Sequence, residues 1–144
     1  MILFCDTSAL VKLYVDEQHS AWTKEQTNLA TLCVVSQITW VESCAAFGLK
    51  YRTQEITLVE QRKALKRLSA EWEMYSRLAI DNKLLEEAGE LSLKVGLRAY
   101  DSIQLASAYR AFEQVGKTLA FCCFDKQLCR AAKGLGLRVV TPIA

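Results

Sequence analysis

Three short runs of apolar residues, none alternating with polar residues, constrain the fold more than any other feature of this chain. The runs are ILFC (residues 2–5), LCVV (32–35) and LAFCCF (119–124). A strand with one face in water alternates, whereas an uninterrupted run suits a strand buried on both faces. Helical patterns separate these runs, and helices are the usual crossover between parallel strands. The pattern predicts a three-layer α/β/α sandwich with a central, mostly parallel sheet.

The other elements are predicted from apolar spacing and from residues that begin or end helices. Helices are expected over residues 8–15, 36–52, 57–72, 101–115 and 126–133, with one more between Asp81 and Gly96, and short strands at 78–80 and 138–143. Ser36 is placed to cap the helix that follows it. A length of 144 residues with 51% hydrophobic content suits a single domain over residues 1–144.

Cysteine and histidine content narrows the class of protein. None of the six cysteines forms a C-x-x-C pair, and most lie in or beside apolar runs, which favours reduced, buried thiols in a cytoplasmic protein. No signal peptide and no membrane span are expected. His19 is the only histidine, so neither a Ser-His-Asp triad nor a multi-histidine metal site is possible, and His19 is expected at the surface.

Two aspartates follow predicted strands directly. Asp6 comes after ILFC, and Asp125 comes after LAFCCF. Ligands of open α/β sheets bind at the carboxyl ends of the strands, so the two carboxylates converge if these strands are neighbours. The alternative is that each aspartate only caps the next helix.

Two further acids lie on predicted helices. Glu42 is inside the helix over residues 36–52, which is apolar nearly all round and is expected to be buried. A buried carboxylate needs a partner, so Glu42 either binds a cation or pairs with a lysine or arginine. Asp101 stands at the end of the core stripe of its helix, although Asp101 and Gln104 also have the spacing of a capping box.

Taken together, the four acids favour a metal site. Clustered carboxylates cannot all stay ionised without a cation, and all-oxygen ligands favour Mg²⁺ or Mn²⁺ over Zn²⁺. Phosphodiester hydrolysis by a metal-activated water is the chemistry that such a site performs well. A phosphotransferase of the haloacid-dehalogenase type is a weak alternative, because Ser8 stands where that mechanism needs a second aspartate.

The sequence resembles the PIN-domain family of ribonucleases, and within it the VapC-type toxins of prokaryotic toxin–antitoxin pairs. The resemblance rests on FCDTSAL, ITWVES, LRAYDSIQLASA and FCCFDKQLCRAAKGLGLRVV, in this order and over nearly the whole chain. It implies a Mg²⁺- or Mn²⁺-dependent endoribonuclease acting on RNA, homodimerisation, and inhibition by a small antitoxin protein.

The resemblance also implies roles for single residues. Asp6, Glu42, Asp101 and Asp125 would form the catalytic, metal-binding constellation. Ser8 would hydrogen-bond within the site, and Thr7 or Ser8 would cap the first helix while Asp6 faces the metal. Many relatives carry a further acid directly after the last aspartate, but here Lys126, Gln127 and Leu128 follow, which argues against a fully occupied second metal site.

One segment has an uneven charge. Residues 50–67 carry six basic and two acidic residues, although the formal net charge of the whole chain is only +2. This segment either follows an RNA backbone or is simply a solvated helix face. Two functional alternatives also stay open: a catalytically silent PIN-like module that only binds proteins, and a housekeeping PIN nuclease without an antitoxin.

Overall fold

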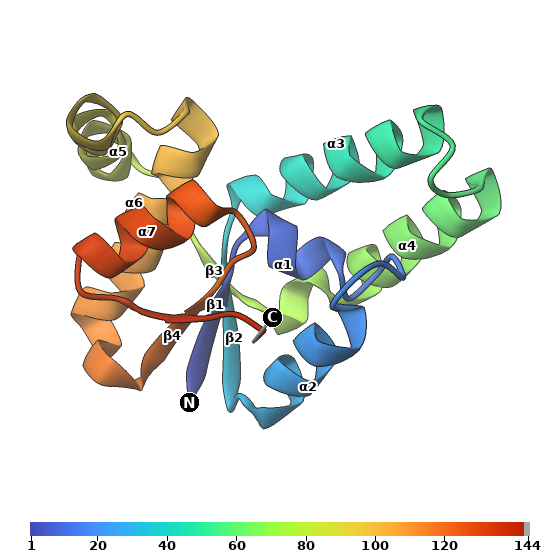
Figure 1. Ribbon diagram of the computed structural model, residues 1–144, viewed down its shortest axis with the longest axis horizontal. Coiled ribbons are helices and arrows are strands. Elements are labelled where there is room, and N and C mark those ends of the chain that lie inside the picture. Colours follow the sequence, from blue (N-terminus) through green and yellow to red (C-terminus); the bar gives the residue numbers. More distant parts are fainter. Residues whose placement is uncertain (143–144) are drawn as a thin grey trace.

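The computed structural model describes residues 1–142, in which five parallel strands form one sheet between two helical layers (Figure 1). The strand order is β3-β2-β1-β4-β5. The strands are β1 (Ile2–Cys5), β2 (Leu32–Ser36), β3 (Ser76–Leu78), β4 (Leu119–Cys122) and β5 (Arg138–Val140). Every pairing in this sheet is parallel, which confirms the predicted α/β sandwich and places β1 beside β4.

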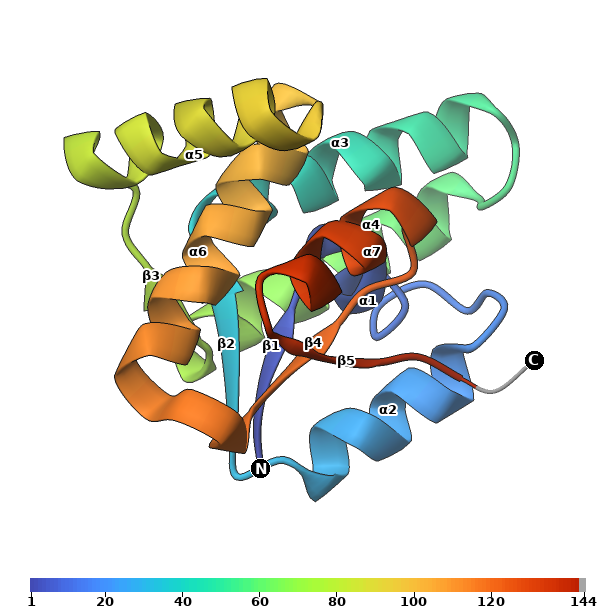
Figure 2. The ribbon, with the colours of Figure 1, turned by 60° about the vertical axis from the view of Figure 1, so that its left-hand side comes forward.

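Helices cover both faces of the sheet (Figures 1 and 2). The helices are α1 (Thr7–Val11), α2 (Ser20–Leu29), α3 (Ile38–Arg52), α4 (Leu58–Glu71), α5 (Asn82–Val95), α6 (Ala99–Val115) and α7 (Lys126–Gly134). One core cluster joins the sheet to α1, α3 and α4, and a second joins its other face to α6 and α7. Helix α5 packs against α6 through a third, smaller cluster.

The two core clusters result from the pleat of the strands, which turns successive side chains to opposite faces. In β1, Leu3 and Cys5 belong to the first cluster, and Phe4 belongs to the second. Phe4 is in register with Phe121 on β4, and their rings meet edge to face with centroids 5.6 Å apart. Both faces of β1 are therefore apolar, as the uninterrupted ILFC run predicts.

All six cysteines are free thiols, which agrees with the predicted reduced state. Cys5, Cys122, Cys123 and Cys129 are buried, whereas Cys33 and Cys44 are half-buried. Cys5 and Cys122 are register partners on the two central strands. Within residues 1–142, no helix is long and apolar enough to cross a membrane.

The N-terminal third departs most from the prediction. Helix α1 begins one residue earlier than predicted and ends at Val11, because the chain then tightens: the amides of Leu13 and Tyr14 bond to carbonyls three residues back. Helix α2 was not predicted at all. Its sequence is mostly polar, and Ser20 and Thr23 are its only fully buried residues, so it lacks the apolar stripe that signals a helix.

Several predicted boundaries shift by one or more residues. Ser36 is the last residue of β2, and its hydroxyl accepts from the amide of Ile38, the first residue of α3, at 3.3 Å, which agrees with its predicted role at the start of this helix. Strand β3 occupies residues 76–78 rather than 78–80, because these residues pair with β2. Strand β4 ends at Cys122, and β5 covers residues 138–140, while predicted strand residue 143 lies outside the described residues. Asp81 caps α5 and Gly96 ends it, as predicted.

Helix α3 is apolar nearly all round, but it is not buried on all sides, contrary to the prediction. Val41 is 59% exposed and Leu49 is 54% exposed, so an apolar stripe of α3 faces outward. Phe47 faces the core at 2% exposure, and Glu42 is half-buried between the two environments. The prediction of a fully buried Glu42 was wrong.

Candidate active site

Asp6 and Asp125 lie at the same edge of the sheet, where the neighbouring strands β1 and β4 end. The Asp6 amide donates to the carbonyl of Cys122 at 3.2 Å, which ties the two strand ends together. Each carboxylate also caps a helix: Asp6 accepts from the Ala9 amide at 3.0 Å, and Asp125 accepts from the Leu128 amide at 2.8 Å. Asp6 and Asp125 therefore both cap helices and lie at the edge of the sheet where ligands bind.

Ser8 connects these two strand ends. Its hydroxyl donates to Asp6 Oδ1 at 2.7 Å and accepts from the Phe124 amide at 3.0 Å. The prediction that Thr7 or Ser8 caps α1 was wrong. The Asp6 carboxylate is the cap, because it already accepts from the free Ala9 amide of the first turn. Ser8 instead fixes the position of Asp6 relative to the residue before Asp125.

The environment of Asp6 disfavours its charge. The residue is 4% exposed, and burial raises the pKa of its carboxyl to about 6, against hydrogen bonds from Ser8, Cys123 and Ala9 that lower it. The nearby charge of Glu42 raises the pKa further. Asp6 is therefore a carboxylate that nearby positive charge would stabilise.

Glu42 is held by neutral donors rather than by a cation. The Thr7 hydroxyl and the Gln104 side-chain amide each donate to Glu42 Oε1 at 2.7 Å. Within residues 1–142, neither lysine nor arginine forms a salt bridge with Glu42. The alternative of an internal ion pair is thus excluded for this part of the chain, and the charge of Glu42 is left without a counterion.

Gln104 was missed as a site residue, because the sequence assigned it to a helix cap. Its side chain is 2% exposed, and Nε2 donates to Glu42, to Thr39 Oγ1 at 2.8 Å and to Thr7 Oγ1 at 3.1 Å. These contacts join α1, α3 and α6. The sequence did contain a sign that Gln104 belongs to the site. Gln104 lies one helical turn from the candidate acid Asp101, as Thr39 does from the candidate acid Glu42.

Asp101 lies in the first turn of α6 rather than at its cap. The helix begins at Ala99 after Arg98, so the predicted capping box with Gln104 was wrong. The Asp101 side chain is 22% exposed and accepts from Arg98 Nε at 3.3 Å, and Arg98 itself is 83% exposed. A pair this open to water holds Asp101 only weakly.

The donor chemistry of this edge fits a hard divalent cation. All candidate ligands are carboxylates, and burial disfavours the ionised form of Asp6 in the absence of a cation. Within residues 1–142, no three His, Cys, Asp or Glu side chains lie close enough to form a metal site by themselves. Mg²⁺ commonly binds through one or two carboxylates and keeps several waters, so a smaller set of protein ligands suffices.

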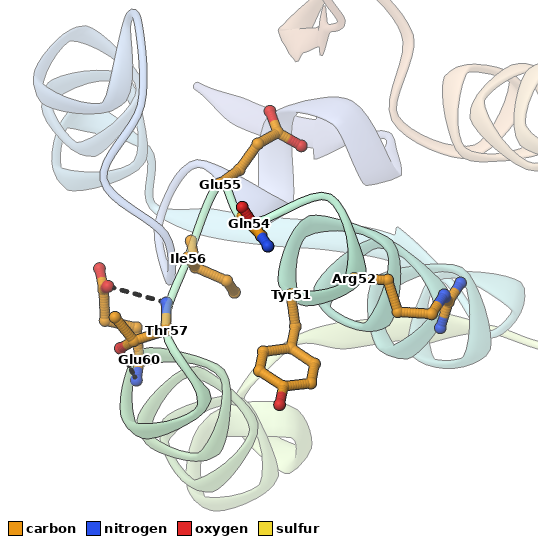
Figure 3. Close-up of a pocket in the computed structure, with 7 residues that line it drawn as sticks. All are labelled: Tyr51, Arg52, Gln54, Glu55, Ile56, Thr57 and Glu60. Atoms are coloured by element: carbon orange, nitrogen blue, oxygen red, sulfur yellow. Dashed lines mark hydrogen bonds between the residues drawn. The ribbon is translucent and has the colours of Figure 1, made fainter.

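A pocket of about 490 Å³ lies elsewhere, at the connection between α3 and α4 (Figure 3). Its walls include the capping box of α4, in which Thr57 and Glu60 exchange hydrogen bonds of 3.0 and 3.1 Å. None of the four acids lines it. The pocket is explained by the turn between two helices, and the candidate chemistry lies at the sheet edge.

Known proteins resemble this chain over nearly its whole length. It matches the PIN domain over residues 3–134, and it is 31% identical to ribonuclease VapC46 of Mycobacterium tuberculosis over 140 residues, 97% of each protein. A toxin–antitoxin complex from Klebsiella pneumoniae aligns with a TM-score of 0.66 and 19% identity, over 99% of this chain and 98% of that chain. VapC20 of Mycobacterium tuberculosis, described as a sarcin-ricin loop cleaving toxin, aligns with a TM-score of 0.66 and 18% identity, over 97% of this chain and 99% of that chain. The fold, the four motifs and this family match agree, and the chain belongs to the PIN-domain family.

Proposed function

We propose that this protein is a Mg²⁺- or Mn²⁺-dependent endoribonuclease and the toxin of a type II toxin–antitoxin pair. The observation that carries the proposal is the environment of Asp6, a buried carboxylate with a raised pKa at the edge where β1 and β4 end. The relationship to ribonuclease VapC46 supports the reaction class. The toxin–antitoxin complex among the structural relatives supports the biological setting.

In this proposal, Asp6, Glu42, Asp101 and Asp125 form the metal site, with one or two of them, Asp6 and Asp101 foremost, binding the cation directly and the others acting through its bound waters. A bound divalent cation supplies an activated water and neutralises charge that develops on the phosphate. The protein's own contribution is position: Thr7 and Gln104 fix one oxygen of Glu42, and Ser8 fixes one oxygen of Asp6. Because the carboxylates repel a bare phosphate, the RNA backbone needs positive charge from elsewhere on the chain.

The exposed face of α4 offers that charge. Arg62, Lys63, Lys66 and Arg67 are all exposed on this helix, as its amphipathic pattern predicted. Such a face contributes affinity that weakens as salt rises, because bound RNA releases counterions. Residues 50–67 are therefore proposed to help bind the substrate.

Two protein partners belong to the proposal. One is a small antitoxin that inhibits the nuclease, and the other is a second copy of this chain. The outward apolar stripe of α3, with Val41 and Leu49, supports a homodimer, since exposed apolar patches usually mark interfaces. Light scattering on the purified protein measures its mass directly. The free thiols agree with the proposed cytoplasmic location.

The decisive experiment is cleavage of total RNA by the purified protein, with new ends mapped by sequencing. We expect cleavage with Mg²⁺ or Mn²⁺, none in EDTA, and none with Asp101→Asn or Glu42→Gln. Asp16→Asn and Glu90→Gln are matched controls, because both residues are exposed and belong to none of the contacts described above. Their activity should equal that of the parent protein.

Expression in a bacterial host provides the second arm. Induction of the parent protein should arrest growth, and co-expression of a small protein encoded next to it should relieve the arrest. Cleavage without any such partner would instead identify a housekeeping nuclease. A parent protein that cleaves no RNA with either metal would favour a silent protein-binding module.

A further inference from the structure

We propose that His19, supported by Phe124, Trp22 and Lys12, forms a stacking site for one base of a single-stranded RNA next to the acidic edge. The inference rests on the proposed function in one respect, the choice of RNA as the ligand. It adds a binding site whose residues are not among the four proposed metal-binding acids. The site combines a left-handed backbone at His19, a stacked pair of rings and a nearby cation.

The backbone of His19 is unusual for a residue with a side chain. Its φ is 70°, in the left-handed region that glycine and asparagine adopt most easily. Two hydrogen bonds to the His19 carbonyl hold this geometry, from the Thr23 amide at 2.9 Å and the Thr23 hydroxyl at 2.8 Å. Histidine, like asparagine and aspartate, is enriched at such backbone positions, and the imidazole makes no capping bond to α2. Held backbone outliers of this kind concentrate at functional sites.

The imidazole of His19 lies flat against the ring of Phe124. Their centroids are 5.7 Å apart and their planes differ by 16°. Trp22 meets the same Phe124 ring edge-on, with centroids 5.8 Å apart. All three residues are half-buried, so part of each ring is accessible to solvent. The expectation that His19 is an ordinary surface residue is thus replaced by a stacked, positioned ring.

The cluster is bonded to the candidate active site. Phe124 directly precedes Asp125, and its amide donates to the Ser8 hydroxyl, which in turn donates to Asp6. Any base stacked on His19 would therefore lie beside the loop that carries Asp125. This placement suits a nucleotide flanking the phosphate to be cleaved.

Positive charge lies within the same cluster. The Lys12 ammonium is 4.5 Å from the centroid of the Phe124 ring. Glu17 pairs with both Lys12 at 3.1 Å and Lys50 at 2.6 Å, so these three side chains together carry one net positive charge. That charge stands next to an edge lined with carboxylates, where a phosphate otherwise meets repulsion.

A flat aromatic face beside a cation is the chemistry that binds unpaired nucleotides. Bases of single-stranded RNA stack on aromatic side chains, and their phosphates pair with lysine. The stacked imidazole and the Lys12 ammonium above Phe124 lie together beside the strand end that carries Asp125. The geometry therefore favours RNA over a role in packing alone.

The test uses His19→Asn, because asparagine accepts a left-handed backbone while losing the ring. Binding is measured by fluorescence anisotropy of a short labelled single-stranded RNA, with EDTA present to prevent metal-dependent cleavage. We expect affinity to fall about tenfold, in line with the measured worth of one stacked base, while the melting temperature stays equal or rises. His19→Phe retains a flat ring and should keep most of the affinity.

Two further arms separate stacking from charge. An RNA of the same length with abasic positions should bind the parent protein and His19→Asn equally. Lys12→Gln should lower the slope of log affinity against log salt by roughly one, because one phosphate contact is lost.

Equal RNA affinity of the parent and His19→Asn would overturn the stacking site and leave the proposed nuclease intact. An equal loss on base-containing and abasic RNA would also overturn it, because the cluster would then act through charge. If His19→Asn instead keeps RNA affinity but weakens a co-purified antitoxin, the site binds protein and the inference is wrong. A parent protein that neither binds nor cleaves RNA overturns both proposals.

Discussion

Asp6 and Asp81 share a local motif and differ in everything around it. Both cap a helix that follows a strand, and both accept a hydrogen bond from the amide three residues on, at 3.0 Å for Ala9 and 2.8 Å for Leu84. Asp6 is 4% exposed, and burial raises its pKa to about 6. The Asp81 side chain is 58% exposed, and hydrogen bonds from Arg110 and the Leu84 amide lower its pKa.

The difference shows that a capping motif neither identifies nor excludes a functional carboxylate. The same hydrogen bond stabilises a helix in both places. At Asp81, Arg110 supplies the counter-charge from within the chain. At Asp6 the like charge of Glu42 raises the pKa further, so the counter-charge is left for a ligand to provide.

The largest expected effect is on RNA cleavage. Asp6→Asn should lower the cleavage rate by at least about a hundredfold, because it removes a proposed metal ligand while keeping the cap. Asp81→Asn also keeps its cap and should leave the rate within about twofold of the parent, as expected for an exposed residue that is not one of the four proposed acids. Initial rates on a labelled RNA with Mg²⁺ measure both. Equal losses in the two variants would remove the functional distinction between them.

The second effect is on stability without metal. A pKa raised from 3.8 to about 6 corresponds to about 3 kcal/mol at most, so Asp6→Asn should raise the free energy of unfolding by about 2 kcal/mol at pH 8. Asp81→Asn should shift stability in the opposite direction and by less, because it loses an attraction to Arg110. Urea unfolding in EDTA tests both. A destabilised Asp6→Asn would show that Asp6 is a structural partner and that its burial is already compensated.

The third prediction concerns pH. The folded protein holds the Asp6 proton more tightly than the unfolded chain, so this stabilising contribution is full below pH 3.8 and is lost as pH rises through about 6. Asp81 has a lowered pKa, so its contribution is present at neutral pH and is lost as pH falls through its folded pKa. The difference in unfolding free energy between the parent and each variant, measured from pH 3 to 8, should therefore change in opposite directions. Parallel curves would contradict the assigned environments.

The smallest effect concerns the contacts around each acid. Gln104→Met keeps the size of the side chain but removes the donor to Glu42, and it should cost about 1 to 2 kcal/mol of unfolding free energy. Arg110→Ala is the counterpart at Asp81 and should cost less, because water reaches the 58% exposed Asp81 and screens the pair. Both are read from urea midpoints. A larger loss for Arg110→Ala would reverse the proposed order of the two regions.

The strands and the strand-end acids could be predicted because their signal is local. The apolar run before Asp6 and the one before Asp125 are visible in the sequence, and adjacency of β1 and β4 confirms that they meet at one edge. Helix α2 escaped prediction because Trp22 alone, rather than an apolar stripe, connects it to the core. Local spacing also misplaced Gln104, since the pattern of a capping box does not reveal where a helix begins.

The contacts that organise the site could not be predicted, because they join residues far apart in the chain. Gln104 reaches Thr7 across 97 positions and Glu42 across 62 positions. No local pattern encodes such pairs. The sequence predicted which acids are candidates, and only the tertiary structure revealed the neutral donors that hold Glu42.

The buried thiols make the rate at which the core opens measurable by chemical labelling. Cys5 directly precedes Asp6, and both Cys5 and its register partner Cys122 are fully inaccessible. A thiol reagent can modify them only when the first core cluster opens, whereas the half-buried Cys33 and Cys44 need smaller fluctuations. Cys123 and Cys129 are buried as well, so labelling followed residue by residue at Cys5 and Cys122 times the opening of this cluster. Any ligand that binds where β1 and β4 end should slow this labelling, without a probe having to be introduced.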